Sequence, residues 1–232
     1  GRLGKACRTL LQDDLPPVTE ATIQKLRSMY PERASEIPDL PETDPLLEID
    51  TEIMCKLVFR KLANGGGAPN SGWTCELIAA LMDDMICKQG IADMVKDIIN
   101  GSIPRTVSHL VLSGREIVLP KGSSIRPIVI GEGILRLAII YATNLLGTDC
   151  LSFLQPIQFG VGAPGGSERI CHVLQAQLEL YGPEAVDVAG DFPNAFGQIP
   201  RERCLRELYL KPKLQPIWRL CDFAYRDHSL VT

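Results

Sequence analysis

Residues 115–137 read REIVLPKGSSIRPIVIGEGILRL and contain the pattern on which the fold prediction depends. Two runs rich in β-branched residues, 115–120 and 125–130, flank the segment KGSS, so we expect a β-hairpin around it. Lys121 near the tip and Arg126 just after it place two cations on this hairpin. Such a pair suits a triphosphate, because lysine offers a point charge and arginine a two-pronged donor to phosphate oxygens. A solvated hairpin with charges that discourage aggregation explains the same residues, and the hairpin taken alone favours that interpretation.

Helical patterns surround the hairpin on both sides. Apolar residues at helical spacing predict helices over 20–30, 50–62, 72–86, 91–99, 131–146 and 167–182, and a further helix that starts at Pro200. Two more strands are predicted: residues 107–113 form a short β-rich run, and in residues 185–192 apolar residues alternate. Residues 36–50, EIPDLPETDPLLEID, are rich in proline and acids and predict an extended linker. The predicted fold class is therefore α+β.

The charge of the chain is unevenly distributed. The 232 residues carry a net charge of −4, which argues weakly against nucleic acid as a partner. Residues 101–137 nevertheless carry a net +3, and residues 200–226 a net +4. Local basic surfaces matter more for phosphate contacts than the total does. No run approaches the roughly 18 apolar residues of a membrane span, so we expect no membrane partner.

The eight cysteines show no C-x-x-C pair, which argues against a zinc site. Most of them lie in apolar helical patterns, so we expect free, buried thiols in a reducing compartment inside the cell. They are Cys7, Cys55, Cys75, Cys87, Cys150, Cys171, Cys204 and Cys221. The chain begins at Gly1 rather than at methionine, from which we expect a fragment or a processed piece.

A glycine-rich stretch at 158–166, QFGVGAPGG, contains G-x-G-x-x-G over residues 160–165, and Asp187 follows. This spacing matches the dinucleotide-binding fingerprint and raises the alternative of a dinucleotide-dependent oxidoreductase. The fingerprint needs a buried parallel strand before the first glycine. The preceding run, LSFLQPIQF, contains Pro156 and makes a poor strand. A tight turn into a helix capped by Ser167 is therefore the favoured interpretation.

Residues 187–201 read DVAGDFPNAFGQIPR and contain the best candidate for a metal ligand. Asp191 stands near the end of a predicted strand, where a carboxylate can hold a divalent metal ion, and the backbone carbonyl of Phe192 offers a second oxygen. A simpler interpretation is that Asp191 caps the turn and that Phe196 belongs to the core. On this stretch alone, the simpler interpretation is favoured.

Taken together, these stretches resemble the reverse transcriptases of non-LTR (LINE-like) retrotransposons. Four segments occur in the order of that family between about residues 60 and 205. They are GGGAPNSGWTCELI, the hairpin with its continuation GEGILRL, QFGVGAPGGSERICHV, and DFPNAFGQIPR, which is similar to the first catalytic motif of the family. The resemblance also accounts for the glycines, which match a turn before the palm rather than a dinucleotide cradle.

The resemblance implies a right-hand polymerase fold. It implies an N-terminal segment and acidic, proline-rich linker over 1–45, a fingers-like region over 46–150, and the start of the palm over 151–232. The implied reaction is RNA-templated DNA synthesis, with an RNA template, a DNA primer and dNTP as partners and Mg²⁺ or Mn²⁺ as cofactor. Such an enzyme is expected in the nucleus.

The resemblance also implies roles for individual residues. Asp191 and the carbonyl of Phe192 would bind the metal ion, and Phe196 would exclude the 2′-hydroxyl of ribonucleotides. Lys121 and Arg126 would contact the triphosphate of the incoming nucleotide. The family positions matched by Arg136 and Gly166 have no role assigned here, and Gly197 departs from the usual Asn or Asp.

One feature of the family is missing from this sequence. Two-metal phosphoryl transfer needs several carboxylates that clamp two ions, and the later Y-x-D-D-like hairpin that supplies them is absent. We therefore expect a truncated or degenerate polymerase that is inactive by itself. The alternatives are a non-catalytic nucleic-acid-binding remnant and, less favoured, the oxidoreductase.

Overall fold

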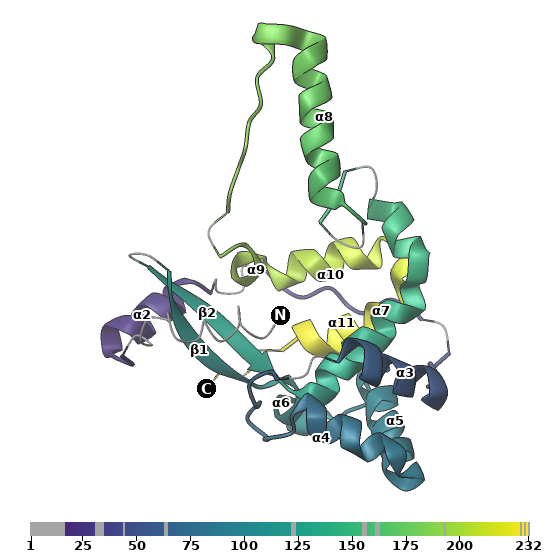
Figure 1. The fold of residues 1–232 in the computed structure, drawn as a ribbon. Helices are drawn as coiled ribbons and strands as arrows, with labels where there is room; N and C mark the ends of the chain where they lie inside the picture. Colours follow the sequence, from purple (N-terminus) through teal and green to yellow (C-terminus); the bar gives the residue numbers. More distant parts are fainter. Residues whose placement is uncertain are drawn as a thin grey trace.

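The computed structural model describes residues 17–30, 35–43, 45–62, 65–121, 124–154, 157–160, 163–192, 194–227, 229 and 231. These residues form a helix-rich α+β fold with a two-stranded antiparallel hairpin (Figure 1). The α-helices are α2 (Glu20–Ser28), α3 (Thr51–Lys61), α4 (Cys75–Ala80), α5 (Met85–Ile99), α6 (Arg105–Leu112), α7 (Gly133–Leu154), α8 (Gly166–Tyr181), α9 (Ala195–Gln198), α10 (Arg201–Tyr209) and α11 (Trp218–Tyr225). The strands are β1 (Gly114–Lys121) and β2 (Ser124–Gly131), and the short 3-10 helices are η1 (Leu81–Asp83), η2 (Gly182–Glu184) and η3 (Pro212–Ile217). No helix of the described residues is long and apolar enough to cross a membrane.

The hydrophobic core lies where α3, α5, α7 and α11 pack together (Figure 1). Apolar residues recur every three or four positions along each helix, so each helix presents one apolar stripe to its neighbours. The innermost side chains are Met54, Val58, Val95, Ile98, Ile99, Leu137, Tyr141 and Phe223. Each large apolar side chain buried in this way contributes about 1.5–3 kcal/mol to folding. The helical part of the fold is thus held by its own core.

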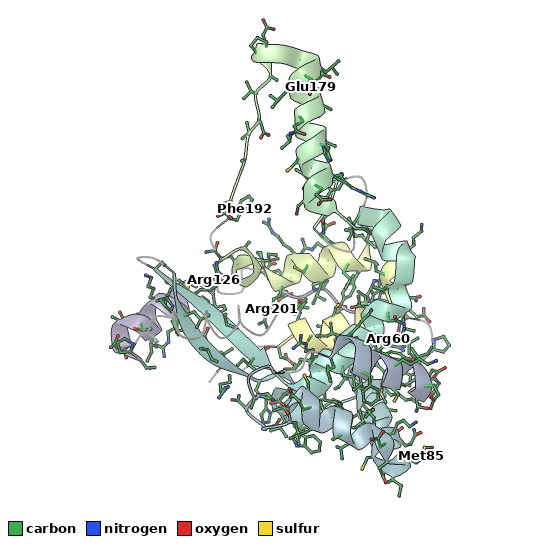
Figure 2. The ribbon with its side chains drawn as sticks, viewed as in Figure 1. Arg60, Met85, Arg126, Glu179, Phe192 and Arg201 are labelled. Atoms are coloured by element: carbon green, nitrogen blue, oxygen red, sulfur yellow. The ribbon has the colours of Figure 1, made fainter. Side chains whose placement is uncertain are left out.

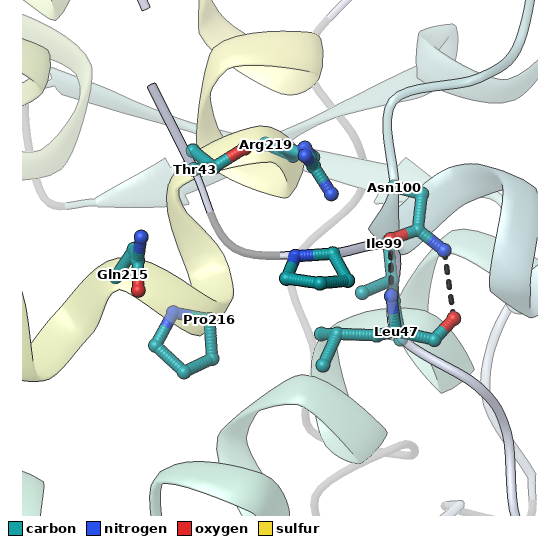
Figure 3. A pocket seen from close by; sticks show the side chains of 8 residues that line it. Thr43, Leu47, Ile99, Asn100, Gln215, Pro216 and Arg219 are labelled. Carbon is teal, nitrogen blue, oxygen red and sulfur yellow. Dashed lines mark hydrogen bonds between the residues drawn. The ribbon is translucent and has the colours of Figure 1, made fainter. Parts of the chain in front are cut away.

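The predicted linker has no regular secondary structure over its described residues 36–43 and 45–50, as expected, and is tied to this core. Asn100, at the end of α5, bonds both backbone groups of Leu47: its Oδ1 accepts from the nitrogen at 2.8 Å, and its Nδ2 donates to the carbonyl at 2.9 Å (Figure 3). The pocket beside this contact has a volume of about 60 Å³, room for little more than water. Asp50 caps α3 as predicted, because its side chain accepts hydrogen bonds from the nitrogens of Glu52 and Ile53 at 2.9 Å.

A buried carboxylate joins the last helices to the rest of the fold. Asp222 of α11 is 5% exposed and accepts hydrogen bonds from Arg226, from Tyr209 of α10 at 2.7 Å and from Arg105 of α6 at 3.1 Å. Burial by itself would raise the pKa of Asp222, but the hydrogen bonds from Arg226 and Tyr209 and the charges of both arginines outweigh it and lower the pKa. Arg226 also donates to the carbonyl of Pro38 in the linker at 3.0 Å.

The hairpin prediction is confirmed. β1 and β2 pair antiparallel from Gly114 opposite Gly131 to Lys121 opposite Ser124. The two turn residues between the strands lie outside the described residues. The helix that follows begins at Gly133, and its helical geometry breaks at Gly147, directly after the predicted end.

Two predicted elements before the hairpin are wrong. Residues 107–113 fall largely in α6 rather than in a strand, because Ser108 and Leu112 are both buried at helical spacing. The helix predicted over 72–86 breaks at Asp84, whose side chain accepts from the nitrogen of Cys87 at 2.8 Å and so starts α5 as a new helix. Burial in the first place, and the capping side chain of Asp84 in the second, outweighed the spacing of apolar residues on which the predictions rested.

The glycine-rich stretch does not follow a strand. Residues 157–160 are irregular and α7 ends at Leu154, so the buried strand of a dinucleotide fold is absent from the described residues there. Gly165, with φ of 64°, precedes α8 in the left-handed conformation, and the predicted Ser167 cap is wrong because the helix already starts at Gly166. A Cβ at Gly166 would overlap the carbonyl of Phe159. These glycines therefore serve a close backbone turn into α8.

The strand predicted over 185–192 is also wrong. This segment runs from the far end of α8 back to α9 (Figure 1) without strand pairing in the described residues. Its apolar side chains Val186, Val188 and Phe192 are 86%, 86% and 77% exposed. A strand needs a neighbour that accepts and donates its backbone hydrogen bonds, and alternation in the sequence does not supply one.

The cysteines of the described residues are free, but they are less buried than expected. Cys171 is exposed, and the others are half-buried: Cys55, Cys75, Cys87, Cys204 and Cys221. Cys7 and the side chain of Cys150 lie outside the described part of the chain. Burial first, with the charges of Cys204 and Asp222 adding to it, raises the pKa of Cys221 to about 11, so that thiol stays protonated at neutral pH.

Candidate nucleotide and nucleic-acid site

The hairpin presents Arg126 to solvent. Arg126 of β2 pairs with Leu119 of β1, and its side chain is exposed, with no hydrogen bond or ion pair to any described residue. Because side chains alternate along a strand, positions 119, 121 and 126 belong to one face of the hairpin, and Glu116 belongs to the other. Only the backbone of Lys121 is described, and it lies opposite Ser124 at the end of β1. A guanidinium that has no partner among the described residues is available for an anionic ligand.

The second predicted site element, Asp191 with Phe192, lies on the exposed segment that leads to α9 (Figure 2). Asp191 is exposed and makes no hydrogen bond to a described residue, so the interpretation of Asp191 as a turn cap gains no support. Phe192 points away from the core, with its side chain 77% exposed. Only the backbone of Phe196 is described, and it lies within α9.

The turn between Asp191 and α9 has a specific conformation. Asn194 has φ of 49° and ψ of 41°, and it is the non-glycine residue with positive φ in the described part of the chain. Asparagine tolerates this left-handed conformation better than most residues do. A Cβ at Gly197 would lie 2.9 Å from Cγ and 3.0 Å from Oδ1 of Asn194, so glycine leaves the space that this side chain uses.

The two elements meet through a third segment at the end of α2. Nδ2 of Asn194 donates to the carbonyl of Met29 at 2.7 Å. The hydroxyl of Tyr30, the next residue, donates to Oε1 of Glu116 in β1 at 2.7 Å. The hairpin and the turn that follows Asp191 therefore both contact residues 29–30, although no hydrogen bond joins them directly in the described residues.

A groove of about 380 Å³ lies beside the other end of the hairpin. It is lined by the loop before α4, the end of β2 and the start of α7, with the side chains of Trp73, Glu76, Glu132, Leu135, Arg136 and Ile139 among its walls. Trp73 is 50% exposed, and the exposed Arg136 has no partner among the described residues. A half-exposed indole beside a free guanidinium is a surface on which a nucleic-acid base can stack while its phosphate is neutralised.

Glu132 and Gly133 hold the tryptophan loop in place. Glu132 is 5% exposed and accepts from the backbone nitrogen of Ser71 at 3.2 Å and from its hydroxyl at 2.5 Å. The hydroxyl of Ser71 in turn accepts from the nitrogen of Trp73 at 3.1 Å. A Cβ at Gly133 would lie 2.9 Å from the Trp73 carbonyl, so only glycine permits this approach. Neither Trp73 nor Glu132 was predicted as a site residue from the sequence, although they lie in the segments G-W-T and G-E-G.

The residues at Asp191 offer part of a metal site. The described residues contain no group of three or more His, Cys, Asp or Glu side chains arranged to hold a metal ion. Asp191 and the neighbouring carbonyl of Phe192 are two oxygen donors of the kind that Mg²⁺ accepts. Magnesium commonly uses one or two carboxylates and completes its shell with water and substrate phosphates, so this pair fits such an ion in the presence of a nucleotide.

Comparison with known proteins relates the chain to retrotransposable elements. It is 30% identical over 185 residues to a protein of such an element, and the aligned part covers 79% of this chain. That relative is the retrotransposable element SLACS 132 kDa protein of Trypanosoma brucei gambiense. The chain spans about 15% of the length of this relative. No family model and no solved structure matches the chain.

Proposed function

We propose that the chain acts in the RNA-directed DNA polymerase of a retrotransposable element, where it binds the incoming nucleotide and the template. The observation that carries this proposal is a shared contact: the hairpin that carries Arg126 and the turn that follows the exposed Asp191 both bond to residues 29 and 30. The relationship to a retrotransposable-element protein supports it. In the proposed reaction the 3′-hydroxyl oxygen of a DNA primer attacks the α-phosphorus of a dNTP and pyrophosphate leaves.

Each residue of the site has a distinct proposed task. Arg126, together with Lys121, binds the triphosphate through charge-assisted hydrogen bonds. Phe196 contacts the sugar and rejects a 2′-hydroxyl. Asp191 and the carbonyl of Phe192 hold Mg²⁺ or Mn²⁺, which, when bound, stabilises negative charge on the transferring phosphate. The exposed position of Asp191, which has no competing partner in the described residues, suits this task.

The groove next to Trp73 is the proposed path of the single-stranded template. Its volume of about 380 Å³ has room for a nucleotide unit, and Trp73 provides a flat apolar face. Arg136 provides the charge for a phosphate, and base–aromatic stacking tolerates any sequence. The nucleic-acid partners proposed for the chain are therefore an RNA template and a DNA primer, and the proposed compartment is the nucleus.

A chimera tests the proposal. The 232-residue chain replaces the segment of the SLACS relative with which it aligns, and RNA-templated primer extension is measured beside the unaltered relative. We expect extension that requires Mg²⁺ and that Asp191→Asn abolishes. Asp187→Asn, which changes an exposed carboxylate four residues earlier, is the matched control and should retain it. Equal loss in both variants would remove Asp191 from the site.

A second function, nucleic-acid binding without catalysis, is favoured by one observation. Asp191 has no second carboxylate beside it that could complete a two-metal site in the described residues. For this reason we expect the 232-residue chain alone to bind single-stranded RNA but to extend no primer above background. Mg²⁺-dependent extension by the chain alone would mean that other carboxylates carry the chemistry.

A further inference from the structure

We propose that Met29 and Tyr30 form a brace that fixes the Asp191 loop relative to the Arg126 hairpin, with Asn194 as the positioning residue. The brace is defined by two contacts: the Tyr30 hydroxyl with Glu116, and the Met29 carbonyl with Asn194. Its effect on catalysis rests on the proposed function, whereas its mechanical role does not. From the sequence, this region was predicted to be an N-terminal segment without a role in the site.

The first contact is made on the face of the hairpin opposite to Arg126. The Tyr30 hydroxyl reaches Glu116 across 86 residues of sequence, with an oxygen–oxygen distance of 2.7 Å. Glu116 faces the side of the hairpin opposite to Arg126, so this contact orients the strands and leaves the guanidinium free. Burial first, and then the hydrogen bond to Glu116, raise the pKa of Tyr30, so the phenol remains a donor throughout the physiological range.

The second contact is made by Asn194, in the turn that precedes α9. Asn194 reaches the Met29 carbonyl across 165 residues of sequence, with a nitrogen–oxygen distance of 2.7 Å. A carbonyl only accepts, so the carboxamide must donate through Nδ2, and an aspartate carboxylate at this position cannot replace it. The left-handed backbone of Asn194 aims the side chain at Met29, and a conformation of this kind persists where the surroundings hold it.

Gly197 makes the second contact possible. A Cβ at this position would lie 2.9–3.0 Å from atoms of the Asn194 carboxamide, and the side chain would have to leave its place. Position 197 is also where the chain departs from the Asn or Asp of the motif it resembles. The departure at 197 and the hydrogen bond from 194 thus form one local arrangement, which explains why glycine stands there.

The two contacts lie on adjacent residues, and this adjacency makes them a brace. The Met29 carbonyl and the Tyr30 Cα belong to one planar, stiff peptide unit, so movement of the hairpin at Glu116 reaches the turn at Asn194 through the Tyr30 side chain and this unit. Asp191 precedes Asn194 by three residues. A nucleotide held between Arg126 and Asp191 depends on a constant separation of the two, since small displacements of reacting groups reduce rates strongly.

Hydrogen exchange in the 232-residue chain tests the brace without any assumption about function. The variants are Tyr30→Phe and Asn194→Asp, and Tyr181→Phe on exposed α8 is the matched control. Loss of one hydrogen bond is expected to speed exchange about 2- to 10-fold. The decisive outcome is the cross-effect: Tyr30→Phe should speed exchange over residues 194–198 as well as in β1, and Asn194→Asp should speed it in β1 as well as in its own turn.

Exchange that changes only beside each substituted residue would overturn the brace. Gly197→Ala provides a separate test, because it should reproduce the exchange pattern of Asn194→Asp while leaving both Tyr30 and Glu116 intact. A pattern for Gly197→Ala that is confined to α9 would also overturn the proposal.

Nucleotide kinetics in the chimera then separate the brace from the proposed function. Tyr30→Phe and Asn194→Asp should each raise the KM for dNTP several-fold, and the affinity for primer and template should change less. A cross-effect in exchange with unchanged dNTP kinetics would keep the brace and reject the proposed nucleotide site. Altered kinetics without a cross-effect in exchange would reject the brace and leave the nucleotide site standing.

Discussion

Replacement of Asp222 by asparagine should destabilise the chain far more than the same change at Asp227. Both carboxylates bind the same guanidinium: Arg105 reaches Asp222 at 3.1 Å and Asp227 at 3.0 Å. The Asp222 side chain is 8% exposed and the Asp227 side chain is 50% exposed. The pair of substitutions therefore compares a buried carboxylate that also binds Arg226 and Tyr209 with an exposed carboxylate that shares its contact with Arg105.

The expected magnitudes follow from this difference. Asp222→Asn leaves the guanidinium groups of Arg105 and Arg226 without their buried counter-charge, and breaking a buried pair costs about 3–5 kcal/mol. Both arginines retain partial contact with solvent, which favours the lower end, about 3 kcal/mol. For a chain of this size that free energy corresponds to a fall in Tm of about 6–12 °C. Asp227→Asn should cost about 0.2–1 kcal/mol, the range of exposed pairs.

Urea unfolding at a series of pH values measures both effects. The pKa of Asp222 is lower in the folded chain than its unfolded value of about 3.9, so its ionised form stabilises the chain above about pH 4. That contribution is lost as the pH falls through the folded pKa, so the difference between wild type and Asp222→Asn should shrink in acid. Equal losses in the two variants, or a difference that persists unchanged at pH 3, would refute the reasoning.

Three further substitutions test the site, the first two in the chimera, because the chain alone is expected to extend no primer. Arg126→Ala should lower kcat/KM for dNTP by about 10- to 100-fold, as loss of a charge-assisted contact predicts, while the exposed Arg60→Ala should not; a loss of template affinity alone would make Arg126 a template contact. Phe196→Val should improve ribonucleotide incorporation relative to dNTP by about 10- to 100-fold, or about 1.4–2.7 kcal/mol; an unchanged ratio with a lower Tm would return Phe196 to the core. Trp73→Ala should weaken single-stranded RNA binding by about 5- to 150-fold in fluorescence anisotropy, which corresponds to the loss of one stacked base. Phe59→Ala removes an aromatic side chain that is 60% exposed, against 50% for Trp73, and is the control; equal effects would reject the groove.

Local sequence signals were sufficient for several elements of the fold. The hairpin over 114–131 was predictable because both strands and the turn-forming segment lie within one short stretch. The start of α3 was predictable because Asp50 caps it from a neighbouring position. Arg126 was predictable as an exposed cation for the same reason, since alternation along one strand is a local property.

Other elements depended on neighbours that the sequence does not reveal. Residues 107–113 carry apolar residues that suit either a strand or a helix, and burial of Ser108 and Leu112 chose the helix α6. The segment 185–192 has the alternation of a strand but no neighbouring strand among the described residues, so it forms no sheet there. Trp73 was missed because its place in a groove depends on Glu132, 59 positions along the chain, through Ser71.

The sequence by itself determined the fold class, the hairpin with its exposed Arg126, and Asp191 as a candidate ligand, because these follow from interactions within a few residues. Only the tertiary structure decided how these residues are arranged around a site. The contacts from Tyr30 to Glu116 and from Asn194 to Met29 span 86 and 165 residues. Contacts of such separation form only when the core of α3, α5, α7 and α11 has brought the segments together, since the entropy of closing such loops must be offset by that packing.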